Sequence, residues 1–225
     1  MRIRHFFLFA VIITFMAVLL SCDGVAEPKK INSGPVLLTD IAFADANFQQ
    51  CVMDSTLTGA ENEGATMSDE ILTLNSCWSM GISSLGGAEK LVNLTSLAVD
   101  FNSITSVSPL KGLTSLTTLY LSYNQISNIG PLAGLTNLTD LYISDNLIVD
   151  VSPLAGLSSL AFLSLSWNNI ATGVNTLTGF TSITTLDIDG NINIPCLHLE
   201  GLIAAYPGLV WPSTATPDVN CSNTL

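Results

Sequence analysis

The chain has 225 residues, 48% of them apolar and 11% charged, a composition that excludes intrinsic disorder and suits one domain with a sizeable core. Its formal net charge of −12, with no Lys or Arg after Lys111, argues against binding to the phosphate backbone of nucleic acids.

The N-terminus is typical of a signal peptide, which we assign to residues 1–21. Arg2 and Arg4 precede an apolar run, Phe6 to Leu20, that is short for a membrane-spanning helix. Without these two arginines the formal net charge changes from −12 to −14.

A cysteine follows this run in the sequence LLSCDG, which resembles the lipobox of bacterial lipoproteins. The resemblance implies an exported protein of the bacterial cell envelope, anchored to the inner or outer membrane by lipid on Cys22. The alternative is an ordinary secretory signal with an incidental cysteine. Residues 22–38 begin polar and lie outside the repeats described below, so we expect a tether between lipid and domain.

Residues 39–92 are expected to form an N-terminal cap and a degenerate first repeat. The sequence FADANFQQCVMDS places Phe48, Cys51 and Val52 on one helical face, and Asp45 can cap that helix. Ile82 and Leu85 precede Ile104 and Val107 of the following repeats by one 22-residue step.

The region 93–195 has a 22-residue period, with units that start at Leu94, Leu116 and Leu138. A fourth unit, which starts at Leu160, is one residue longer, and a fifth begins at Ile183. One such unit cannot bury its own leucines, but stacked units share a continuous core, and their LxL segments form a parallel sheet. The Pro and Gly of SPLAGLT suit a tight return without a full helix.

The pattern LxxLxLxxNxI resembles the leucine-rich-repeat family, and the repeat length is closest to bacterial internalin-like proteins. This resemblance implies a right-handed solenoid, α/β by convention but dominated by β-structure, with a short parallel sheet on its concave face. Asparagines where the chain turns inward are expected to form a structural ladder of hydrogen bonds: Asn102, Asn124, Asn146, Asn168 and Asn191.

Residues 196–225 are expected to form a C-terminal cap with a short apolar helix and a returning tail. Four cysteines remain after Cys22, and export permits disulfides. Strands about 4.8 Å apart separate the two caps too far for a bridge between them. The predicted disulfides are therefore Cys51–Cys77 and Cys196–Cys221.

Outward positions of the repeats combine aromatic and acidic side chains, which we predict to bind a ligand on the concave face. Exposed aromatic rings on a rigid sheet offer contact area at low entropic cost. The alternative is that the rings pack partly against neighbouring coils and that the acids only keep the protein soluble. The predicted ligand-binding residues are Asp100, Phe101, Tyr120, Tyr123, Asp140, Tyr142, Asp145, Phe162, Trp167, Asp187 and Asp189.

No catalytic site is indicated, and no cofactor is expected. His198, the one histidine after the signal peptide, has no second histidine with which to bind a metal. Serines such as Ser122, Ser144 and Ser166 fall at positions expected to be exposed, without a base in register. A calcium site at Asp187 and Asp189 stays open as an alternative, although their spacing lacks a recognisable loop motif.

These observations predict a non-enzymatic module of the envelope that binds another protein through its concave face, and its acidic side chains suit a basic partner. Two alternatives stay open: a glycan-binding module, for which aromatic rings beside Asp and Ser would also serve, and a structural or adhesive module without a dedicated ligand. The fold alone does not name the ligand.

Overall fold

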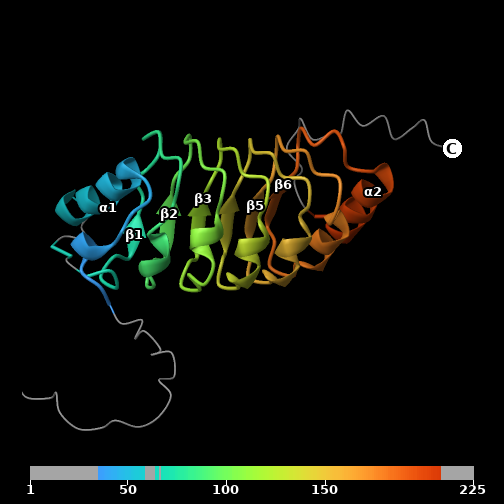
Figure 1. Ribbon diagram of the computed structural model, residues 1–225. Coiled ribbons are helices and arrows are strands. Elements are labelled where there is room, and N and C mark those ends of the chain that lie inside the picture. Colours follow the sequence, from blue (N-terminus) through green and yellow to red (C-terminus); the bar gives the residue numbers. More distant parts are fainter. Residues whose placement is uncertain (1–34, 59–63, 66, 209–225) are drawn as a thin grey trace, which may run out of the picture. The chain divides into compact units, whose positions relative to one another are not determined.

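The computed structural model describes residues 35–58, 64–65 and 67–208, which belong to one compact unit that begins at Pro35. Six short parallel strands follow one another across a single sheet in chain order (Figure 1). They are β1 (Thr73–Leu74), β2 (Ser96–Ala98), β3 (Thr118–Tyr120), β4 (Asp140–Tyr142), β5 (Phe162–Ser164) and β6 (Thr185–Asp187). We call the segment that contains each strand and its return a coil, numbered 1 to 6 with the strands. The predicted leucine-rich-repeat solenoid with a parallel sheet is confirmed.

The register of the sheet follows the sequence repeat. Leu119 lies opposite Leu97 on one side and Leu141 on the other, as the 22-residue period requires. The step from Phe162 to its partner Thr185 is one residue longer. The central leucine of every strand from β2 to β6 is completely buried. The longer fourth unit therefore enters the sheet without breaking the alignment of its core.

Short 3-10 helices return the chain on the other side of the coil. Proline lies in the first turn of η3 to η5, where its fixed φ suits a helix start and its missing N–H costs no bond. The extra residue of the fourth unit falls near Gly173, whose φ of +80° suits glycine. The bounds of these helices are η2 (Ala88–Lys90), η3 (Ser108–Leu110), η4 (Gly130–Gly134), η5 (Ser152–Gly156) and η6 (Val174–Gly179).

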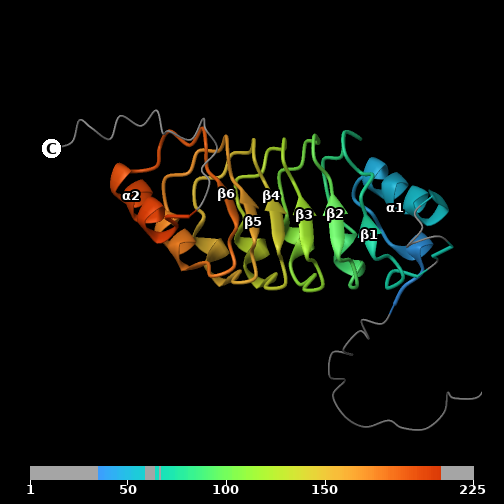
Figure 2. The same ribbon diagram turned by 180° about the vertical axis from the view of Figure 1, so that it is seen from behind.

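The helices α1 (Ala46–Thr58) and α2 (Cys196–Ala205) lie at opposite ends of the row of strands, as both views show (Figure 2). Phe48 and Val52 of α1 are fully buried against the first coil, and Leu202 of α2 is buried at the other end. Both helices cover leucines that a terminal coil would otherwise expose. No helix within the described ranges is long and apolar enough to cross a membrane.

The packed domain begins before the expected boundary at residue 39. The Val36 amide donates a hydrogen bond to Ser68 Oγ (3.1 Å), and Leu37 pairs with Met67 in an isolated antiparallel bridge. Leu38 opens the 3-10 helix η1 (Leu38–Asp40) and is buried. Residues 36–38, which the sequence pattern assigns to the tether, are therefore part of the cap. Residues 1–34 lie outside the described residues.

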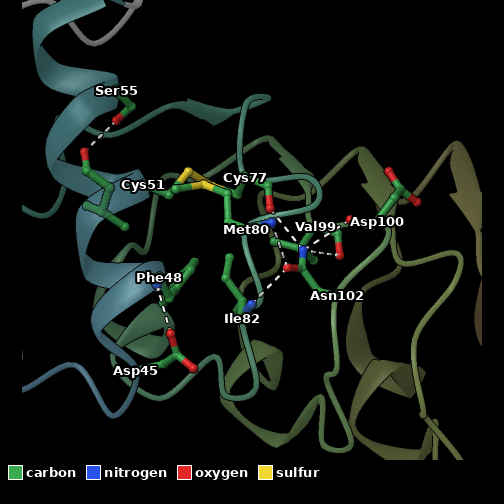
Figure 3. Close-up of a disulfide and its surroundings, with 11 residues drawn as sticks. Asp45, Phe48, Cys51, Ser55, Cys77, Met80, Ile82, Val99, Asp100 and Asn102 are labelled. Carbon is green, nitrogen blue, oxygen red and sulfur yellow. Dashed lines mark hydrogen bonds between the residues drawn. A yellow bond between two sulfur atoms is a disulfide. The ribbon is translucent and has the colours of Figure 1, made fainter.

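The predicted Cys51–Cys77 disulfide is present and joins α1 to coil 1, with 5.5 Å between the two Cα atoms (Figure 3). Asp45 caps α1 through hydrogen bonds from the amides of Asn47 (2.9 Å) and Phe48 (3.0 Å). Cys196 is also disulfide-bonded. Its predicted partner, Cys221, lies outside the described residues.

Candidate binding surface

The asparagine side chains that follow the strands hold one coil against the next. Asn146 accepts a hydrogen bond from the Ile126 amide (2.9 Å) and donates to the Leu121 carbonyl of the preceding coil (3.0 Å). Asn102 makes the same kind of contacts with coil 1, to the Ile82 amide and the Cys77 carbonyl (Figure 3). The corresponding bonds recur at Asn124, Asn168 and Asn191.

Directly before each asparagine the backbone is left-handed. In coils 2 to 5 these positions have φ between +52° and +56°, and Gly190 has the same sign in coil 6. This turn directs the next side chain, the asparagine, into the core. It costs an ordinary residue about 1–2 kcal/mol, which glycine avoids. The four residues are Phe101, Tyr123, Asp145 and Trp167, so three bulky aromatic side chains occupy positions where their backbone is strained.

The side of the sheet that faces away from the core is called the outer face below. It consists of the outward residues of the strands and of the two residues before each asparagine. All the residues predicted to bind a ligand lie on it by register. Phe101, Tyr123 and Trp167 are 56%, 48% and 65% exposed, whereas Tyr120, Tyr142 and Phe162 are half-buried.

The aromatic rings of this face form two stacks. Tyr120, Tyr142 and Phe162 stack in sequence, with 4.4 Å between the centroids of each neighbouring pair. Phe101 and Tyr123 form the second stack, at 4.2 Å and 9° between the ring planes. Stacking fixes the rings, and each stacked ring packs against an aromatic ring of the neighbouring coil, as the alternative reading of these residues expected.

The carboxylates of the face are held by neutral donors. The Ser122 amide donates to Asp100 Oδ1 (2.8 Å), Thr139 Oγ1 donates to Asp140 Oδ2 (2.7 Å), and Ser164 Oγ donates to Asp187 Oδ2 (3.2 Å). Burial raises the pKa of Asp100, and the bond from Ser122 offsets part of this rise. Burial also raises the pKa of Asp145, which a hydrogen bond from Tyr123 partly offsets.

The same environment acts on one tyrosine of the longer stack. Burial raises the pKa of Tyr142, and the neighbouring Tyr120 and Asp140 add to this rise. Tyr142 is therefore a neutral phenol at physiological pH.

Several outward serines are buried, contrary to the expectation that they are exposed. Ser144 and Ser166 are 8% and 7% exposed, and their hydroxyls lie 2.9 Å apart; Ser144 Oγ is also 2.6 Å from Ser164 Oγ. Small side chains between neighbouring coils are covered by the residues around them, and these hydroxyls satisfy one another. Ala98 and Ser164 are buried in the same way.

One exposed aromatic residue of the outer face was missed by the sequence reasoning. Trp78 is 60% exposed and corresponds in coil 1 to Asp100 in coil 2. The Ser79 amide bonds to the Asp100 carbonyl (2.9 Å), which places the two coils side by side at this point. Extending the 22-residue step between Ile82 and Ile104 back to residue 78 would have found it.

A second ladder, of threonines, was also missed. Thr117 Oγ1 donates to the Thr95 carbonyl (3.1 Å), and Thr139 Oγ1, which shares its one hydrogen with Asp140, lies 3.1 Å from the Thr117 carbonyl. Thr95 and Thr184 bond in the same way to the coils before them. The recurring threonine of LTSL, LTTL and LTDL was the available signal.

The remaining polar candidates do not come together as a site for metal. Among the described residues no group of three or more His, Cys, Asp or Glu side chains could hold an ion, Asp187 and Asp189 included. His198 lies in α2, away from the strands, and within the described structure its buried Nδ1 has no hydrogen-bond partner.

Comparison with known proteins agrees with this geometry. A family model for leucine-rich repeats in two copies matches residues 114–156. Internalin C2 of Listeria monocytogenes is 30% identical, with a TM-score of 0.54, and the match covers 84% of this chain and 94% of that one. The chain belongs to the internalin-like leucine-rich-repeat proteins.

Other leucine-rich-repeat structures are similar over a smaller part of their length. The functional domain of InlJ from Listeria monocytogenes, which includes a cysteine ladder, is 27% identical with a TM-score of 0.60. That match covers 75% of this chain and 36% of the chain of that domain. The internalin InlF of the same organism, 24% identical with a TM-score of 0.55 over 80% of this chain and 58% of its own, shares the fold. No curated protein matches the sequence.

Proposed function

We propose that this leucine-rich-repeat protein is a binding module of the bacterial cell envelope that holds another protein on its outer face and catalyses no reaction. The observation that carries this proposal is the set of stacked and exposed aromatic rings on one face of a rigid sheet. Rings fixed by stacking lose little entropy on binding, which is a property of interaction hot spots.

The backbone strain at Phe101, Tyr123 and Trp167 also supports a role in binding. Glycine occupies the equivalent position at Gly190, so the fold itself does not require an aromatic side chain there. Strained residues concentrate at functional sites, where the strain is compensated by the rest of the structure.

A protein ligand is favoured over a glycan by the way the rings are stacked. Sugars pack on the faces of aromatic rings, and Tyr142 has Tyr120 on one side and Phe162 on the other. Ring edges and hydroxyl groups are what this stack offers, and they suit the mixed contacts of a protein surface.

Export and lipid on Cys22 are part of the proposal and rest on the sequence alone, since residues 1–34 lie outside the described structure. Replacing Cys22 by serine is expected to move the protein from the membrane fraction of cells to the soluble fraction. Unchanged fractionation of Cys22→Ser would contradict lipid anchoring.

The binding proposal is tested by photo-crosslinking in intact cells. Benzoylphenylalanine at Tyr120, an aromatic replacement on the outer face, is expected to give an adduct with one other protein. The same probe at Ala133, an exposed residue of η4 on the return side, is the control and is expected to give none. Adding Tyr142→Ser should reduce the yield at Tyr120.

Three other results would contradict the proposal. Equal adducts from both positions would indicate contact without a preferred surface. An adduct degraded by glycosidases but not by proteases would indicate a glycan ligand. A complete lack of adducts would favour a structural module.

A further inference from the structure

The row of left-handed positions on the outer face is aromatic except where Asp145 interrupts it. In coils 2 to 5 the row reads Phe101, Tyr123, Asp145 and Trp167. Backbone hydrogen bonds hold these coils in step, from the Tyr123 amide to the Ser144 carbonyl (3.0 Å) and from the Asp145 amide to the Ser166 carbonyl (2.9 Å). A carboxylate therefore lies between two aromatic side chains along the axis of the solenoid.

The two rings beside Asp145 are held apart from each other. The Tyr123 ring stacks on Phe101 in the coil before it. The Trp167 ring leans over Gly190 in the coil after it, where a Cβ atom on the glycine would come within 2.7 Å of Trp167 Cδ2. Two coils at about 4.8 Å each put the backbones of Tyr123 and Trp167 roughly 9.6 Å apart. Asp145 is the residue between these two backbones, and its short side chain fills less of this spacing than an aromatic ring would.

The charges near Asp145 are complementary to a cation. After Lys111 the sequence contains no Lys or Arg, so coils 4 to 6 supply no basic side chain to the outer face. Burial raises the pKa of Asp145 and the nearby Tyr123 hydroxyl lowers it, so a hydroxyl and not a cation accompanies this carboxylate. Asp100, Asp140, Asp187 and Asp189 add negative charge to the same face, which disfavours a second copy of this chain as the occupant.

We propose that Tyr123, Asp145 and Trp167 form a subsite for an arginine side chain of the bound protein. This inference rests on the proposed function, because it specifies the chemistry of the partner. The guanidinium group is planar, can pair with a carboxylate through two N–H groups and can stack on an aromatic ring at the same time. The lysine ammonium has the charge but cannot stack, so the subsite discriminates between the two.

The test measures binding of labelled peptides to the purified full-length protein. The probes are a peptide with three arginines separated by glycines and the same peptide with lysines. We expect the arginine peptide to bind about fivefold more tightly, which is the effect of stacking at a partly exposed ring. Asp145→Asn and Trp167→Ser should each abolish this preference.

Matched variants separate the subsite from general attraction to an acidic protein. Glu200→Gln removes one exposed carboxylate from α2, and Leu197→Ser removes one exposed apolar side chain from the same helix, away from the outer face. Both are expected to keep the preference for arginine. Asn tolerates the left-handed backbone of residue 145, and Trp167 is mostly exposed, so unchanged unfolding midpoints are expected for all four variants.

The proposal is overturned if the two peptides bind equally, or if Glu200→Gln has the same effect as Asp145→Asn. Photo-crosslinking at Tyr120 tests the binding function separately from the peptide measurements. An adduct there without an arginine preference would leave the binding function in place and remove only the subsite. A preference for arginine without any adduct would support the subsite and contradict the function.

Discussion

At the scale of single residues, one amide explains how the coils stay in register. A buried side-chain amide can accept and donate hydrogen bonds at the same time. Asn146 accepts from the Ile126 amide and donates to the Leu121 carbonyl, and its NH₂ group also lies within bonding distance of two carbonyls of its own coil. Coil 1 has Met80 at the equivalent position, where there is no earlier coil to bond. Asparagine therefore occurs where a preceding coil supplies the partners.

Asn146→Ala is expected to lower the free energy of unfolding by about 3 kcal/mol, because it leaves buried backbone groups of two coils without partners. Urea denaturation measures the effect. The control is Asn137→Ala, whose exposed amide donates to the Thr114 carbonyl (2.8 Å) and whose loss should cost less than about 1 kcal/mol. Equal losses in the two variants would contradict a special role for the ladder.

At the scale of elements, Asp45 connects helix α1 to the first coil. One carboxylate oxygen accepts the amides of Asn47 and Phe48 at the start of the helix. The other accepts the amide (2.8 Å) and the hydroxyl (2.7 Å) of Ser83. Burial by itself would raise the pKa of Asp45, but these hydrogen bonds outweigh it and hold the pKa below its ordinary value of 3.8.

This shift predicts an acid-sensitive cap. A carboxylate whose pKa is lowered by folding stabilises the protein above its ordinary pKa, and the contribution is lost as the pH falls through the lowered value. The difference in unfolding free energy between the wild type and Asp45→Asn should be constant above about pH 5 and shrink below pH 3.8. Denaturation at a series of pH values measures it.

The control for this measurement is Asp40→Asn, which removes an exposed carboxylate of η1. We expect the difference in unfolding free energy between this variant and the wild type to stay small across the pH series. A stability difference for Asp45→Asn that persists unchanged at pH 2 would show that the charge of Asp45 has no part in holding the cap.

At the scale of the whole described domain, stability depends on closing the ends of the stack. The Cys51–Cys77 bridge joins positions with a sequence separation of 26 and holds α1 over coil 1, where both cysteines are buried. Phe48 and Val52 cover the same end. In a stack of coils each unit contacts only its neighbours, so damage to one end is expected to stay local.

Replacing both cysteines by alanine is therefore expected to lower the free energy of unfolding by on the order of 3 kcal/mol, the chain-entropy value for a loop of this length. Hydrogen exchange should show the loss of protection first in α1 and coil 1. Coils 4 and 5 should keep their protection, and an equal loss along the whole stack would contradict this picture.

The sequence could predict much of the fold, because the 22-residue period carries over directly into space. Leu119 and Leu141 are neighbours in the sheet because they hold the same position in consecutive coils, and the same is true of Tyr120 and Tyr142. The cap helix and the Cys51–Cys77 bridge also follow from local patterns and from the distance between the ends. Trp78 and Val36 were harder to place, because the first coil departs from the repeat and the cap is formed by contacts distant in sequence.

What the sequence determined by itself was therefore the stacking of coils: which leucines and asparagines turn inward, and which residues share the outer face. What only the tertiary structure decided was how far each outward side chain is exposed and where it leans. Ser144 is buried, the rings of Phe101 and Tyr123 stack, and Trp167 covers Gly190. Exposure and stacking depend on the sizes of neighbours one coil away, and the repeat pattern gives the positions of these neighbours but not the space left between them.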